Sequence, residues 1–494
     1  MKSNEKLEER VGHLLRELGN GADVKSRYFR LSDQEKAACM IYIEGIVDTA
    51  SIQDHIVDPL LNKHIKFDHA FIDQLIERVV ETALVEKITD KQAPGKLLEG
   101  FALIVVDQEE IIIAADTVKW QERSLSSPKG QRALQGPDLG FTESRGGNVA
   151  LVRKWVKNAD LRHELTTYGD LTNTTVSLLY IEGIVEPDIL NEIKAKLASV
   201  ALDSVLDSNY IAESITKEAQ SIFPLTLNSD RPDVVAAEIL EGRVCIIVDG
   251  SPYALIAPAV LVQFFQSADD YYLPAPASRL IRRIRFLLFW LSVYIPGTFV
   301  AFTTFHAGIL PVNLLVGFVA QREAVPFPTF LEVLVVDFLI QAILEASNRL
   351  PQNVSVTISL FGAIVFGQSS VEAQLIQPIT LVVLSVSFIL SSIIPIATMS
   401  YATRILRVAF ILIGALLGLY GIALLTLLLL VHLCYLRSFG VPYLAPFAPF
   451  TLKDQRDTLI RNPIPTITHK EVRFHKEEPM DSANQVNEKE ENDS

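Results

Sequence analysis

Residues 286–305 read FLLFWLSVYIPGTFVAFTTF, a run of about 20 residues without a charge. An α-helix of that length is about 30 Å long and can cross the hydrocarbon core of a bilayer. A group of arginines stands directly before this run, and further apolar runs follow it. The predicted membrane spans are 286–305, 354–373, 376–397 and 408–436. We therefore expect an α-helical, polytopic membrane domain over residues 279–437.

The arginines before the first span predict its orientation. They are Arg279, Arg282, Arg283 and Arg285. Because basic residues concentrate on the cytoplasmic side of a span, the preceding head is expected in the cytosol. The first residues are charged and have no apolar core, so no signal peptide is expected. The tail 438–494 is predicted to be cytosolic with a disordered end, because its last residues are too polar to bury a core. Four crossings would keep the tail in the cytosol and five would not; both remain open.

The head contains a repeat. Residues 41–47 read IYIEGIV and residues 179–185 read LYIEGIV. A second pair of matching segments follows each copy at a similar distance, at 99–118 and 241–260. Two copies of one supersecondary unit explain these matches, each with strands that end at a turn. The predicted fold is thus an α/β cytosolic head of two repeated subdomains, 1–119 and 177–278, joined by a connecting segment, 120–176, and followed by the membrane domain.

The segment 327–350 carries acidic residues among apolar ones. Asp337, Gln341 and Glu345 are spaced by four and form one stripe on a helix, and Arg349 continues it as a partner for Glu345. Such a helix either lies in the membrane interface with its stripe in solvent or faces a water-filled interior. In the second case Asp337 and Glu345 would attract cations.

The span 354–373 is rich in small and hydroxyl-bearing residues. Small residues on one face of a span usually allow close helix packing. The alternative is that this face lines a narrow aqueous path, with Val365 or Phe366 as an apolar constriction and Glu372 at a mouth. The residues of this face and its constriction are Ser355, Ser359, Gly362, Val365, Phe366, Ser369 and Glu372.

Composition and motifs exclude several classes of function. A net charge of −14 with no basic tract argues against a nucleic-acid partner. The three cysteines lack metal-ligand spacing, and no nucleotide-binding loop, nucleophile elbow or zinc-protease motif is present. We expect no enzyme activity, no cofactor and no metal site.

Many short motifs, in order, resemble the A subunits of bacterial spore germinant receptors, the GerA family. They span almost the whole chain, and they include YIEG at 180–183, FFQSADDYY at 264–272, RLIRRIRF at 279–286, FTTFHAGILP at 302–311, GQSSVEA at 367–373 and SFGVPYLAPFAPF at 438–450. The sequence departs from the family pattern at Gln135, where arginine is expected, and at Ser369 and Ser370, where alanine is more usual.

The resemblance implies a channel-forming subunit of a receptor in the inner membrane of the spore. Its implied partners are a permease-like B subunit, a lipoprotein C subunit, membrane lipid and further copies of the same chain in a ring, expected to be a pentamer. Opening of the ring would release monovalent cations and start germination. Under this implication the face of 354–373 is expected to line the pore, while Arg279, Arg282, Arg283 and Arg285 anchor the cytosolic rim. A non-conducting scaffold, and a related sporulation channel that amplifies germination without sensing nutrients, remain as alternatives.

Overall fold

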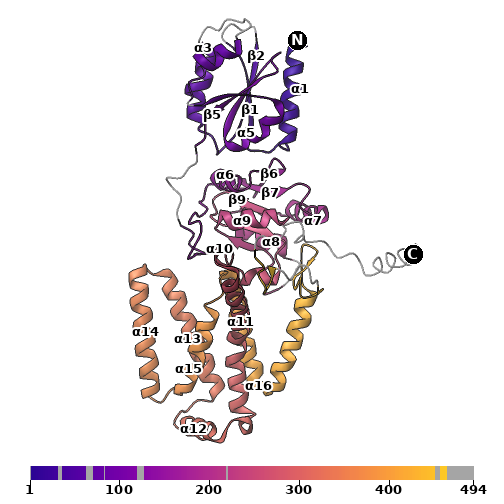
Figure 1. Cartoon of the computed structure of the whole chain (residues 1–494). Coiled ribbons are helices and arrows are strands. Elements are labelled where there is room, and N and C mark those ends of the chain that lie inside the picture. Colours follow the sequence, from indigo (N-terminus) through magenta and orange to yellow (C-terminus); the bar gives the residue numbers. More distant parts are fainter. Residues whose placement is uncertain are drawn as a thin grey trace, which may run out of the picture.

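The computed structural model describes residues 2–31, 36–62, 71–82, 84–119, 127–217, 221–450 and 457–463. The chain is elongated, with an N-terminal α/β unit, a second α/β unit and a set of long helices following one another along its length (Figure 1). Residues 464–494, which contain the end predicted to be disordered, lie outside the described residues.

The first unit is built on a five-stranded antiparallel sheet. Its strands are β1 (Val24–Arg30), β2 (Ala37–Ile43), β3 (Val85–Ile88), β4 (Phe101–Val106) and β5 (Ile112–Asp116). Its helices are α1 (Lys2–Glu17), α2 (Thr49–Ile52), η1 (Gln53–Val57), α3 (Asp58–Asn62), α4 (Phe71–Gln74), η2 (Leu75–Val79), η3 (Asp90–Gln92) and α5 (Ala93–Glu99). The strand order is β1-β2-β4-β5-β3. Every residue of β4 is buried because helices cover both faces of the sheet. Leu103 and Val105 face the core under α1 and α5. Ala102 and Ile104 face the core on the other side, under the helices of 49–79.

The second unit has the same architecture. Its strands are β6 (Leu161–Tyr168), β7 (Thr174–Ile181), β8 (Leu227–Ser229), β9 (Val244–Val248) and β10 (Ala254–Ala257). Its helices are α6 (Arg145–Trp155), α7 (Pro187–Ala198), α8 (Ser208–Thr216) and α9 (Pro232–Leu240). The strand order β6-β7-β9-β10-β8 repeats that of the first sheet, strand for strand. The core on one face contains α6 and α9, and the core on the other contains α7 and α8.

The matching strand orders are those that the sequence repeat predicts. The two copies of YIEG lie at the ends of β2 and β7, which are equivalent strands. Gly45 and Gly183 adopt φ of 90° and 78° there, a conformation that favours glycine. The repeated Glu-Gly pair is therefore explained by the turn that each strand makes as it ends.

The segment 120–176 is more than the connector that the sequence predicts. It contains α6 and β6, and β6 pairs with β7 along its whole length, from Leu161↔Ile181 to Tyr168↔Thr174. A boundary at 177 would cut through the β6–β7 ladder. Strand β6 escapes detection because it is an edge strand whose second half is mostly exposed and polar, so it lacks an apolar run.

A buried ion pair joins the two units of the head. Arg153 and His163 of the second unit surround Asp23 of the first, with Arg153 Nη2 3.0 Å and His163 Nδ1 3.1 Å from Asp23 Oδ1. Burial alone would raise the pKa of the Asp23 carboxyl, but the hydrogen bond with His163 and the charge of Arg153 outweigh burial and hold that pKa well below its usual range. The carboxylate thus stays ionised and keeps the units together at neutral pH.

A short linking region leads from the second unit into the long helices. It comprises η4 (Leu261–Phe265) and α10 (Asp269–Tyr272). The helices that follow are α11 (Ala275–Thr304), η5 (Ala307–Ile309), α12 (Val312–Glu323), α13 (Thr329–Arg349), α14 (Gln352–Glu372), α15 (Pro378–Ser391) and α16 (Ala397–Tyr435). In the described part of the chain, α11 and α16 are long and apolar enough to span a membrane, and α15 is a shorter apolar helix.

Helix α13 contains the segment that was expected to be amphipathic or interfacial. It packs against α11, α15 and α16 as well as α14. Its first half buries Glu332, Val333, Val336 and Asp337. Within the bundle, Glu332 accepts hydrogen bonds from Gln377 and Asp337 pairs with Arg407, so these acidic residues are compatible with a helix inside the bundle. The packing favours a place within the bundle over a place beside it.

Helix α16 is two antiparallel helices that meet at Gly418. This residue has φ 61° and ψ −148°, a conformation that is essentially restricted to glycine. A straight helix of 39 residues would be about 58 Å long. Instead, Ile396 and Leu436, at its two ends, both lie near the second α/β unit, while Gly418 lies at the far end of the bundle against His306. The chain then passes through β11 (Arg437–Ser438) and β12 (Val441–Pro442) along the second unit.

Candidate functional site

The head is fixed to the helices by a group of buried charges that we call the junction cluster: Asp270, Arg282, Arg285 and Asp457. Arg282 donates from Nε to Asp270 Oδ2 at 3.1 Å and from Nη1 to Asp457 Oδ1 at 2.9 Å. Arg285 donates to the same Asp270 oxygen at 3.0 Å. The Arg282 side chain is fully buried. The cluster therefore ties together the linking region, the start of α11 and the tail.

The tail residues 457–463 are held against the start of α11. Arg282 Nη1 also donates to the backbone carbonyl oxygen of Thr458 at 2.8 Å. Arg461 donates to the carbonyl oxygens of Tyr271 and Leu273, and Arg279 Nε donates to the carbonyl oxygen of Arg461 at 2.6 Å. A movement of the head relative to α11 would thus strain contacts with the tail as well.

The four arginines predicted to anchor the cytosolic rim differ in their surroundings. Arg282 and Arg285 belong to the junction cluster and are too buried to reach lipid. Arg279 bonds the tail, and Arg283 is exposed. The prediction that all four arginines anchor the cytosolic rim therefore does not suit Arg282 and Arg285, because both form ion pairs within the protein.

A second buried ion pair lies among the long helices. Arg407 of α16 donates from Nη1 to Asp337 Oδ1 of α13 at 3.0 Å, and both side chains are at least 95% buried. Five residues before Asp337, Glu332 accepts hydrogen bonds from the backbone and side-chain nitrogens of Gln377 at 3.0 and 2.9 Å. Asp337, predicted to attract cations, is therefore neutralised within one chain.

The other predicted acidic residue, Glu345, is exposed. It forms the predicted pair with Arg349, whose Nη2 lies 2.7 Å from Glu345 Oε1. Exposed pairs of this kind contribute little to stability. The acidic stripe of α13 is thus divided into a buried half that packs and an exposed half that faces outward.

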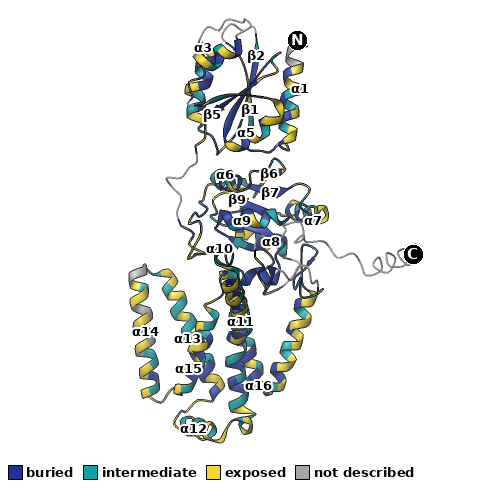
Figure 2. Cartoon of the chain, in the orientation of Figure 1, coloured by how far each residue is buried: buried dark blue, intermediate teal, exposed yellow. Residues whose placement is uncertain are grey.

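The predicted pore residues lie on α14, at the edge of the bundle. Phe366 and Gly362 are half-buried: Phe366 packs against a core shared by α11, α13 and α15, and Gly362 lies near Ile343 of α13. Ser369 and Glu372 are exposed, and Glu372 accepts a hydrogen bond from Gln368 at 2.9 Å. Ser355 is half-buried. The side chains of Ser359 and Val365 lie outside the described part of the structure. Figure 2 shows the outer side of α14 largely exposed.

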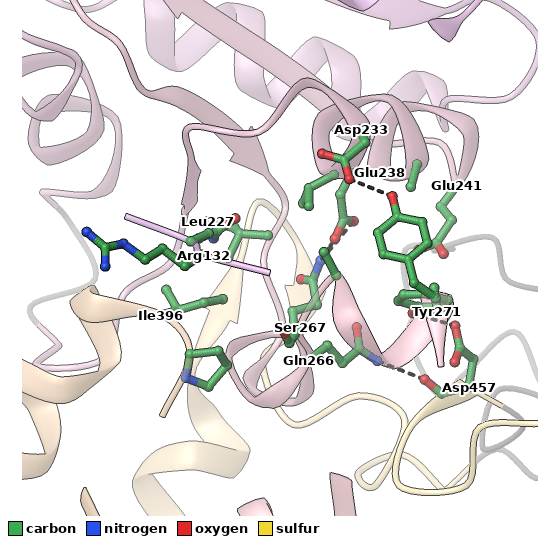
Figure 3. Close-up of a pocket in the computed structure, with 17 residues that line it drawn as sticks. Arg132, Leu227, Asp233, Glu238, Glu241, Gln266, Ser267, Tyr271, Ile396 and Asp457 are labelled. Atoms are coloured by element: carbon green, nitrogen blue, oxygen red, sulfur yellow. Dashed lines mark hydrogen bonds between the residues drawn. The ribbon is translucent and has the colours of Figure 1, made fainter. Parts of the chain in front are cut away.

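A cavity of about 320 Å³ adjoins the junction cluster (Figure 3). Its walls come from the loop at 131–132, from α9, from the linking region, from the loop before α16 and from Asp457 of the tail. Tyr272 donates to Asp233 at 2.5 Å, Gln263 to both oxygens of Glu238 at 3.0 Å, and Gln266 to the carbonyl oxygen of Asp457 at 2.8 Å.

Sequence reasoning did not single out the cavity, Asp457 or the pairing of Arg407. Arg407 stands at an end of a predicted span, and Asp337 stands among apolar residues of another segment. Opposite charges in two apolar segments are a signal that could have suggested their pairing. Asp457 offers no such signal because it lies in a polar tail. Within the described residues, no group of three or more His, Cys, Asp or Glu side chains is arranged to hold a metal ion.

The fold defines a class of protein in which a two-unit α/β head is fused to a bundle of apolar helices and fixed to it by buried ion pairs. The chain belongs to the Bacillus/Clostridium GerA spore germination protein family, whose model matches residues 12–472. The family predicted from the sequence motifs is confirmed.

Similar proteins span nearly the whole chain. Spore germination protein KA of Bacillus subtilis (strain 168) is 39% identical over 461 residues, which cover 92% of this chain and 84% of that protein. The uncharacterized membrane protein YfkQ of the same organism is 33% identical over 473 residues, covering 93% and 91%. Among solved structures, the N-terminal domain of the A subunit of the Bacillus megaterium spore germinant receptor GerK3 is 33% identical, with a TM-score of 0.42, and the match covers 51% of this chain and 95% of that one.

Proposed function

We propose that this chain is the A subunit of a nutrient germinant receptor in the spore inner membrane, and that several copies form a nutrient-gated channel for monovalent cations. Membership of a spore germination family supports the role in germination. The partners that we propose are a permease-like B subunit that binds the nutrient, a lipoprotein C subunit, membrane lipid and a ring of identical chains, with five copies as the working number.

The helix arrangement supports a multi-pass membrane domain with a cytosolic head. If α11, α13, α14, α15 and the two halves of α16 each cross the membrane, the chain makes six passes, rather than the four or five considered from the sequence. An even number is consistent with the position of both ends of the bundle beside the second α/β unit (Figure 1). The arginines at the start of α11 then lie on the cytosolic side.

The position of α14 is the observation that carries the channel proposal. Among the helices of the bundle its main contacts are with α13, and it stands at the edge with much of its surface exposed (Figure 2). A helix with hydroxyl and carboxylate groups is costly to expose to lipid. In a ring of chains, α14 of each copy could face the axis, with Phe366 near a constriction and Ser369 and Glu372 toward a mouth.

Gating would follow from the way the head is attached. Nutrient binding on a partner would favour an arrangement of the bundle that opens the path, and the junction cluster would transmit that change to the head. Because Arg282 and Asp270 are buried and paired, the head and α11 would move together instead of sliding independently.

Cation flux through liposomes that contain the purified full chain tests this function. Phe366→Ala should increase leak because it widens the constriction, and Glu372→Gln should lower cation flux because it removes a charge at the mouth. Leu416→Ala, on an α16 residue that is 69% exposed, is the control and should leave flux unchanged. If neither α14 variant changes flux while both lower the yield of the complex with the B and C subunits, the scaffold alternative holds.

A further inference from the structure

The cavity beside the junction cluster is made by parts of the chain that are far apart in sequence. Its wall includes Leu227 of the second unit, Gln266 of the linking region, Ile396 of the loop between α15 and α16, and Asp457 of the tail (Figure 3). A ligand held there would contact the head, the bundle and the tail at once. Its affinity would therefore depend on how these parts are arranged.

One side of the cavity is apolar. Leu227 and Val234 come from β8 and α9, and Pro395 and Ile396 come from the loop before α16. Pockets for small molecules are concave and largely apolar, and a few placed polar groups fix the ligand, so the composition and the volume of about 320 Å³ suit a small organic molecule.

The polar side carries acidic groups whose counter-ions lie behind the wall. The carboxylates are Asp233, Glu238, Glu241 and Asp457. Buried arginines pair with Asp233, Glu238 and Asp457 from outside the lining: Arg231, Arg243 and Arg282. Arg132 is the cationic residue that lines the cavity, and it is exposed. The lining therefore presents oxygen acceptors and disfavours an anionic ligand.

Glu241 has spare capacity to bind a donor. Its Oε2 lies 3.5 Å from Arg243 Nη2, a long contact, and the side chain is 19% exposed. Burial raises the pKa of the Glu241 carboxyl to about 8, and the charge of Asp457 adds to the rise while Arg282 opposes it. The contact with Arg243 is longer than a strong charge-assisted hydrogen bond, and a bound ammonium group would supply a closer cation.

We propose that this cavity binds a small protonated amine with an apolar body. The ammonium group lies between Glu241 and Asp457, and the apolar body lies against Leu227, Val234 and Ile396. Binding favours the arrangement in which head, bundle and tail enclose the amine. The binding step is independent of conduction, whereas its effect on gating rests on the proposed function.

Thermal stabilisation of the full chain in nanodiscs by three probes of one size tests the proposal: hexylamine, hexanol and hexanoate. Hexylamine should stabilise the wild-type chain and hexanoate should not, since a ligand that binds the folded state raises its apparent stability. Glu241→Gln, which keeps the side-chain shape, should weaken hexylamine binding about tenfold, the factor given by roughly 1.4 kcal/mol. Glu213→Gln, an exposed carboxylate of the same unit, is the matched control and should bind as the wild type does.

Ile396→Ala separates a specific site from general partition into the lipid. This variant should lower the affinity for hexylamine and for hexanol together, because it removes apolar contact and leaves the carboxylates in place. Equal stabilisation by hexylamine of the wild type and Glu241→Gln, or a preference for hexanoate, would overturn the proposal. Loss of amine binding with normal cation flux would refute the amine site alone, and amine binding without any flux would refute the channel alone.

Discussion

Replacement of Arg282 by methionine should release the head from the helices, whereas the same change at Arg283 should not. The two arginines are neighbours on α11, and each is followed within a turn by apolar residues. Arg282 is fully buried in the junction cluster, and Arg283 is exposed. A comparison of the two variants therefore isolates the effect of burial and ion pairing, because the residue type is the same and the positions are adjacent.

The expected magnitude follows from the contacts that are lost. Arg282 makes four hydrogen bonds: to Asp270, to the side chain and backbone of Asp457, and to the backbone of Thr458. Asp270 keeps Arg285 as a partner and the Asp457 carbonyl oxygen keeps Gln266, so the main loss is the ion pair with Asp457 Oδ1. Breaking a buried pair on one side costs about 3–5 kcal/mol. An exposed arginine removed from a helix surface changes stability by about 0.5 kcal/mol or less.

Thermal unfolding of the detergent-purified chain and limited digestion with trypsin measure the two effects. Arg282→Met should lower the midpoint temperature and make the bond after Arg461 cleavable, because the tail loses its attachment. Arg283→Met should resemble the wild type in both measurements. Equal midpoints and equal cleavage for the two variants would refute the view that the junction cluster holds head, α11 and tail together.

Three further predictions concern other parts of the chain. Gly414→Ala should destabilise the fold by about 1–3 kcal/mol, because the added methyl group would lie 2.5 Å from a carbonyl oxygen of α11. The control is Gly317→Ala, whose added methyl group would have no atom within 4 Å. This variant should be neutral or stabilising in the same melting assay. Equal effects would contradict the close packing of α11 and α16. Asp337→Leu and Arg407→Leu should each cost about 3–5 kcal/mol because each leaves a buried charge, and the double variant should be more stable than either single one. If the losses of stability in the two single variants simply add in the double variant, the ion pair between Asp337 and Arg407 is refuted. Burial raises the pKa of the Glu241 carboxyl to about 8, so Glu241 holds its proton more tightly in the folded protein than in the unfolded protein. The free energy of unfolding should therefore fall as pH rises from about 4.5 to about 8. Melting of Glu241→Gln should lack that part of the fall, and identical pH profiles would exclude the assignment.

The sequence predicted the elements whose signal is local. The repeated YIEG strands marked equivalent positions in two sheets, and the pairing of Glu345 with Arg349 followed from their spacing on one helix. Strand β6 was missed because an edge strand with an exposed polar half has no apolar run. The antiparallel halves of α16 were missed because the run 408–436 is apolar on both sides of Gly418, and the turn depends on one backbone conformation.

By itself, the sequence determined that this protein has a two-unit α/β head and a set of long apolar helices, and it identified the family. These features depend on periodicity, on repeats and on runs of apolar residues, which each segment carries in its own composition. Only the tertiary structure decided which charges meet: Arg282 with Asp270 and Asp457, and Asp337 with Arg407. These partners are 12 to 175 residues apart in the chain, and an ion pair between distant segments is set by how the helices pack and not by the residues next to either charge.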